Sequence, residues 1–90
     1  MVEFKLYVVQ SSPRTAMIVE KLKEILKDEF NNQFVLEVID VFENMDMTES
    51  DGILATPTLI KTSPEPCKRV IGDFGDSEKV FTGLGCRTND

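Results

Sequence analysis

The sequence predicts one α/β domain built on a four-stranded sheet with two to three helices. Two strand-like segments rich in β-branched and aromatic residues flank a long amphipathic segment in the first half of the chain. Two shorter strand-like segments and a final amphipathic segment occupy the second half. The length of 90 residues suits a single domain over residues 1–90, in which residues 85–90 are a frayed tail.

The pattern of the first half predicts a strand, a helix and a second strand. Residues 4–9 form the first predicted strand. Ser12 is expected to cap the helix and Pro13 to be its first residue, because the missing proline N–H needs no partner there. Apolar side chains at helical spacing extend this helix to Phe30. The second strand, residues 34–41, is almost continuously apolar, which is typical of a strand covered on both faces.

The second half predicts a short, weak helix over 43–52, a third strand within 53–61 and a fourth over 68–71. Residues 76–78 open the final helix. This order of elements is the thioredoxin plan. Pro57 interrupts the third strand, and Thr56-Pro57-Thr58 is expected to hold a cis-proline at the strand entrance, with an ordinary trans bond as the alternative.

Composition and charge exclude several classes of function. The content of 41% hydrophobic and 29% charged residues is that of a globular protein. A net charge of −6 repels phosphate backbones and anionic lipid, so neither nucleic acid nor a membrane is an expected partner. No apolar run approaches the roughly 20 residues of a membrane span, and the first residues lack the pattern of a secretion signal. The expected location is the cytoplasm.

The residues that carry most enzyme chemistry are missing from the expected places. Cys67 and Cys86 form no CxxC motif, and without histidine they cannot build a His/Cys zinc site. Two reduced thiols are expected, with a disulfide as the alternative that the expected cytoplasmic location disfavours. The first strand-to-helix turn, residues 10–14, has no cysteine, which excludes dithiol redox chemistry there. Ser11 and Ser12 have no histidine to activate them.

The carboxylates show no metal-binding motif, and no phosphate-binding glycine motif is present, so no cofactor is expected. They are interpreted as solvated surface: Asp40, Asp46, Glu49, Asp51, Asp73 and Asp76.

Several short segments, in this order and spacing, resemble the KaiB family, small proteins of the cyanobacterial-type circadian clock. The resemblance covers residues 4–84, and its segments are Lys5-Leu6-Tyr7-Val8, Val38-Ile39-Asp40-Val41, Ile53-Leu54-Ala55-Thr56-Pro57-Thr58-Leu59, Ile71-Gly72-Asp73 and Glu78-Lys79-Val80. It implies a protein without enzymatic activity that binds the hexameric ATPase KaiC and then captures KaiA. It also implies two packings of one chain, a tetramer with a rearranged second half and a thioredoxin-like monomer that binds KaiC.

The residues expected to bind a partner are Lys68, Arg69, Gly52 and Glu37. Lys68 and Arg69 are interpreted as a basic pair that docks on an acidic face, with solvated surface as the alternative. Glu37 and Gly52 stand where the family commonly has lysines, and the family uses the first of these lysines toward KaiA. A KaiA partner is therefore left open, and a KaiB–KaiC system without KaiA, in rhythm or stress adaptation, fits the sequence.

The expected fold-switch or structural positions are Tyr7, Pro57, Gly72, Asp73, Gly83 and Gly85. Gly83-Leu84-Gly85 is expected to end the last helix in one packing and to take another path in the other. Two other functions are weighed. The first is a sensor module of a KaiB-like histidine kinase pathway, which the chain length disfavours because a kinase domain should follow. The second is a thioredoxin-like redox enzyme, which the cysteine-free turn disfavours.

Overall fold

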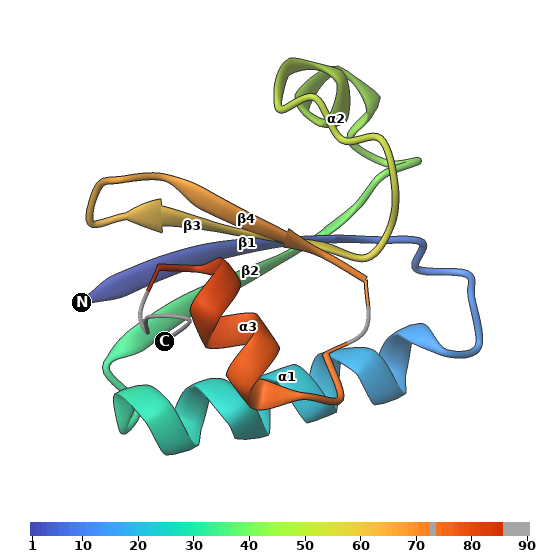
Figure 1. Cartoon of the computed structure of the whole chain (residues 1–90). Helices are drawn as coiled ribbons and strands as arrows, with labels where there is room; N and C mark the ends of the chain where they lie inside the picture. Colours follow the sequence, from blue (N-terminus) through green and yellow to red (C-terminus); the bar gives the residue numbers. More distant parts are fainter. Residues whose placement is uncertain (73, 86–90) are drawn as a thin grey trace.

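The computed structural model describes residues 1–72 and 74–85, in which strands and helices follow one another as the sequence predicts. The elements are β1 (Val2–Val8), α1 (Thr15–Phe30), β2 (Phe34–Asp40), α2 (Met45–Ser50), β3 (Thr58–Ser63), β4 (Lys68–Ile71) and α3 (Ser77–Gly83). The sheet order is β2-β1-β3-β4, with β1 parallel to β2 and antiparallel to β3, and β3 antiparallel to β4 (Figure 1). The thioredoxin plan is confirmed, and the rearranged second half is not the arrangement of this structure.

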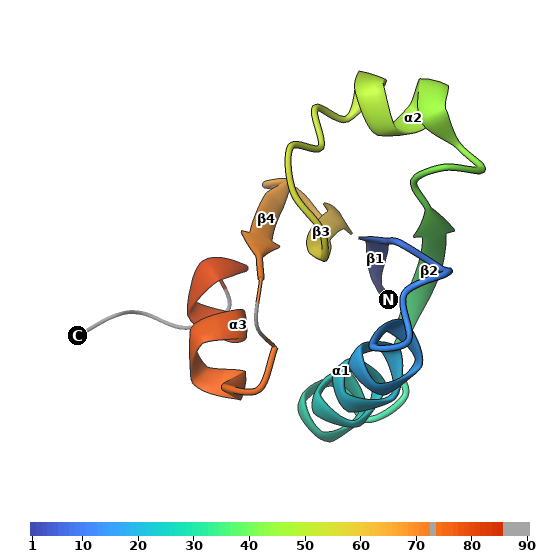
Figure 2. The same cartoon turned by 90° about the vertical axis from the view of Figure 1, so that its right-hand side faces the viewer.

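The helices lie on both sides of the sheet. α1 and α3 cover one face, here the α1 face, and α2 lies over the other, here the α2 face (Figures 1 and 2). The main core fills the space between the sheet and the two helices of the α1 face. Its buried members are Phe4, Leu6, Val8, Leu22, Ile25, Leu26, Leu59, Phe74, Val80, Phe81 and Leu84.

A smaller apolar cluster lies on the α2 face. Tyr7, Ile39 and Ile60 are buried there, and Val41 and Ile53 pack against them. These two partly buried residues belong to the segments that lead into and out of α2. α2 has only six residues, so this helix and its flanking segments shield only part of that face.

The prediction that both faces of the second strand are covered is wrong. β2 is an edge strand, and Val35 and Val38 are 47% and 37% exposed. Phe34 and Leu36 pack against the main core. Val35 is not a member of the small cluster on the α2 face, so a nearly continuous apolar sequence did not mean a doubly buried strand.

The ends of several elements have a local cause. The α1 helix stops where Asn31 adopts a left-handed conformation, with φ of 50°, and its N–H donates to the Lys27 carbonyl at 2.8 Å. The predicted start of the last helix is confirmed, because the Asp76 carboxylate accepts from the backbone N–H groups of Glu78 and Lys79. The third strand begins only after Pro57 and runs to Ser63, two residues beyond the predicted range.

Candidate functional site

The turn between β1 and α1 is the place where a redox domain of this plan would carry its cysteines. The predicted cap is wrong here, since α1 begins at Thr15 rather than at Pro13 and has no side-chain cap. The buried Thr15 hydroxyl donates to the Val9 carbonyl, and the Ser12 N–H donates to the same carbonyl at 3.0 Å. These bonds hold residues 10–14 in a turn, so the first helical turn starts two residues later.

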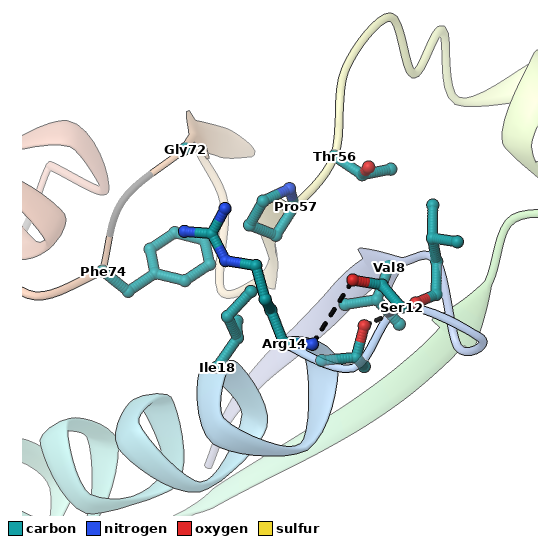
Figure 3. Close-up of a pocket in the computed structure, with 10 residues that line it drawn as sticks. Val8, Ser12, Arg14, Ile18, Thr56, Pro57, Gly72 and Phe74 are labelled. Atoms are coloured by element: carbon teal, nitrogen blue, oxygen red, sulfur yellow. Dashed lines mark hydrogen bonds between the residues drawn. The ribbon is translucent and has the colours of Figure 1, made fainter.

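A cavity of about 510 Å³ lies beside this turn, on the side of Pro57. The Thr56–Pro57 bond is cis, as predicted. The cavity is lined by Val8, Val9, Ser12, Arg14, Thr15, Ile18, Thr56, Pro57, Gly72 and Phe74 (Figure 3). The lining residues described by the structure include no cysteine and no carboxylate. The first turn of α1 also holds no acidic residue.

A second arrangement of polar groups lies on the α2 face, around Tyr7. The Tyr7 hydroxyl donates to the Asp51 carboxylate and lies 3.4 Å from the Met47 carbonyl. The Lys5 ammonium is 3.4 Å from the same carboxylate oxygen. Asp51 follows α2, so these contacts tie that helix to the first strand. The interpretation of Asp51 as a solvated carboxylate is therefore wrong.

The protonation of this pair is set by its surroundings. Burial raises the pKa of the Tyr7 hydroxyl well above its usual value, and the hydrogen bond to Asp51 raises it further. The hydrogen bond from Tyr7 lowers the pKa of the Asp51 carboxyl against the opposing effect of burial, and the Lys5 charge lowers it as well. The pair is thus a neutral phenol and an ionised carboxylate across the neutral pH range.

Two other carboxylates also have structural contacts instead of being only solvated. Asp40 accepts from the backbone N–H of Gln10 at 3.1 Å, next to the β1–α1 turn. Asp76 is the cap of α3. Neither contact was predicted, because each depends on where the carboxylate lies relative to the start of a turn or helix.

Three of the four predicted partner-binding residues lie on the α2 face. The strand register aligns Glu37, Lys5, Ile60 and Arg69 in one row across β2, β1, β3 and β4. The Arg69 guanidinium also lies 3.4 Å from the Gly52 carbonyl, which it faces as a donor. Gly52 itself has φ of 64° directly after α2, a conformation that suits glycine.

Lys68 lies apart from this group. It pairs with Lys61 in the row that includes Phe4, and Phe4 belongs to the core of the α1 face. Successive side chains of a strand point to opposite faces, so Lys68 and Arg69 cannot contact one flat partner surface together. The structure therefore separates the predicted basic pair.

Large apolar side chains are exposed around Arg69 and α2. Ile71 lies two residues after Arg69 on the same face and is 57% exposed. Phe42 and Met45, before and within α2, are 67% and 68% exposed, and Leu54 after it is 94% exposed. None of these residues is among the predicted partner-binding residues, because no local signal distinguishes them from buried apolar residues.

The predicted fold-switch positions have different local environments. Gly72 and Gly85 have φ of 100° and 77°, which strains other residue types. Gly83 is helical, and a Cβ there would lie 2.6 Å from a Val70 methyl group. The lack of a side chain at this position therefore permits close packing of α3 on β4. Asp73 and Cys86 lie outside the described residues, and Cys67 is an exposed free thiol.

None of the helices in residues 1–72 and 74–85 has the length and apolar character needed to cross a lipid bilayer. Among solved structures, the N-terminal domain of SasA from Synechococcus elongatus matches with a TM-score of 0.76 and 25% identity over 99% of this chain and 88% of that one. Thioredoxin 1 from Thermosipho africanus matches with a TM-score of 0.69 and 26% identity over 89% of this chain and 88% of that one. Both likenesses agree with the thioredoxin-like arrangement.

The sequence comparisons are more specific. The chain is 49% identical over 80 residues to the circadian clock oscillator protein KaiB of Rippkaea orientalis, which covers 89% of this chain and 77% of that protein. The KaiB domain family matches residues 5–86. With this family match, and with relatives of this identity over most of both chains, the chain belongs to the KaiB family of circadian clock proteins.

Proposed function

We propose that this protein is a non-catalytic regulator that binds a KaiC-like ring ATPase through its α2 face. Membership of the KaiB family supports a role in a clock or a related timing or stress-adaptation system. The 49% identity to a KaiB protein, against 25% to the SasA domain, favours a KaiB-type role over that of a SasA-type sensor module. The absence of cysteine from residues 10–14 argues against a thioredoxin-like enzyme.

The position of Arg69 is the observation that best supports docking through the α2 face. This exposed cation lies on the α2 face next to exposed Ile71, and Gly52 and Glu37 share that face. Arginine beside apolar surface is a common anchor of protein interfaces. Lys68 carries the same charge one residue away but lies on the opposite face of the sheet. The proposed docking therefore uses Arg69 and not Lys68.

The neighbouring residues Lys68 and Arg69 supply a matched experiment. Arg69→Glu should slow association with a purified KaiC-like ring and reduce the salt dependence of the association rate, whereas Lys68→Glu should change both much less. Biolayer interferometry at several salt concentrations measures both quantities, and circular dichroism confirms that each variant is folded. Equal effects of the two substitutions would contradict docking through the α2 face, and no binding by the wild-type protein would contradict the function.

We also propose that the protein is cytoplasmic, that it self-associates, and that its chain exchanges between the packing described here and a second packing. The positive φ of Gly72 and Gly85 and the close approach of Gly83 to Val70 support a second half that depends on special backbone positions. Two packings of one sequence need differ by only a few kcal/mol. Whether the protein also captures a KaiA-like protein is left open, since Glu37 on the α2 face stands where the family has a lysine used toward KaiA.

A further inference from the structure

The cavity beside Pro57 has no part in the proposed ring docking. Its volume of about 510 Å³ lies within the range of small-molecule sites. Half of its ten lining residues are large and apolar, and they come from two parts of the chain, β1 to α1 and the segments around β3 and β4: Val8, Val9, Ile18, Pro57 and Phe74. A few polar groups among apolar walls are the usual composition of a ligand site.

Among the described residues of this lining, Arg14 is the only one with an ionisable side chain. It is exposed and extends across the cavity toward Pro57 and Phe74 (Figure 3). Two of the other polar side chains already have partners, since Thr15 donates to the Val9 carbonyl and the Ser12 hydroxyl accepts from the Arg14 N–H at 3.4 Å. The Thr56 hydroxyl is a neutral group of the lining and carries no charge that would select an ion. The guanidinium is therefore the group that would select a ligand.

We propose that this cavity binds a small organic anion, a carboxylate carried on an apolar body. A guanidinium matches a carboxylate with two parallel, charge-assisted hydrogen bonds. The apolar walls would bury the body of the ligand, and the lining residues that the structure describes include no carboxylate that would repel its charge. This inference is independent of the proposed ring docking, because Arg14 and the cavity residues are not part of the α2 face row that contains Arg69.

The test is an NMR titration of the 15N-labelled full chain with phenylacetate. Two probes each remove one half of the ligand: acetate lacks the apolar body, and phenylacetamide lacks the charge. Phenylacetate should give saturable shifts at the amides of Val9, Ser12, Arg14 and Gly72, with a dissociation constant in the millimolar range. Acetate and phenylacetamide should bind at least about tenfold more weakly.

Arg14→Gln should weaken phenylacetate binding by at least about tenfold, because it removes a hydrogen bond to a charged group. Lys21→Gln is the matched control, since it removes one exposed cation from the same helix outside the cavity. Absence of saturable shifts, equal affinity of wild type and Arg14→Gln, or equal binding of phenylacetamide would overturn the proposal. Glycyl-phenylalanine offers the same carboxylate on a peptide, and tighter binding of the dipeptide would assign the cavity to a protein chain end instead.

Discussion

At the scale of single residues, Tyr7 is the group whose loss should cost most on the α2 face. Its hydroxyl is a donor to the half-buried Asp51 carboxylate, and the ring is fully buried. Tyr7→Phe keeps the ring but leaves the carboxylate without this donor, so the free energy of unfolding should fall by about 2 kcal/mol. Urea denaturation measures the change. Thr62→Val is the control, since it removes a hydroxyl that donates to the Glu3 carbonyl at an exposed position, and a similar loss in both variants would contradict the assigned role.

The hydrogen-bonded pair of Tyr7 and Asp51 also predicts how the stability of the fold depends on pH. The folded chain lowers the pKa of Asp51, so its contribution is complete above the unfolded pKa of about 4 and is lost as the pH falls through the folded pKa. The free energy of unfolding of the wild type should therefore fall more steeply between about pH 5 and pH 2 than that of Asp51→Asn. Denaturation at a series of pH values tests this.

Asp46→Asn is the control for that pH series, since it removes an exposed carboxylate from α2 without touching Tyr7. Its stability should follow the wild-type pH dependence. If Asp51→Asn and the wild type have the same slope, the carboxylate does not stabilise the fold through Tyr7 and Lys5.

At the scale of elements, the packing of α3 on β4 depends on Gly83. Alanine is a better helix former than glycine, but its Cβ would lie 2.6 Å from a Val70 methyl group. Overpacking of this kind costs about 1–3 kcal/mol. Gly83→Ala should therefore lower the free energy of unfolding less in a Val70→Ala background than in the wild type, by about 1 kcal/mol or more. A double-mutant cycle of unfolding free energies measures this coupling, and additive effects would show that α3 moves away freely.

At the scale of the whole molecule, the small core and the exposed apolar side chains around α2 predict self-association. A domain of this length buries only about 60–65% of its unfolded surface, so association would add stability that a monomer lacks. Sedimentation velocity from micromolar to millimolar concentration should show larger species at the higher concentrations, and the melting temperature should rise with concentration. Amide NMR spectra should then contain two sets of resonances whose shares change with dilution. Only monomer, with a single set of resonances, would contradict both association and exchange of packing.

The parts of the fold that depend on local spacing were predictable from the sequence. The first strand, the long helix and the strand after it follow from short-range patterns, as do the start of the last helix and the proline at the entrance of the third strand. Within the candidate site, the cysteine-free turn and Pro57 came from the same kind of signal. The sequence also allowed the placement of Lys68 and Arg69 on opposite faces to be predicted, because successive side chains of a strand point to opposite faces of the sheet. The prediction nevertheless treated the two residues as one basic pair.

The sequence by itself determined the order and type of the elements and the family, because these depend on residues close together in the chain. Only the tertiary structure decided that Tyr7 meets Asp51, 44 residues later, and that β2 lies at the edge of the sheet with Val35 exposed. The same holds for Arg14, which reaches a cavity shared with Pro57. These features depend on which strands pair and on the path of the chain between them. They are contacts between residues far apart in the sequence, which short-range spacing does not encode.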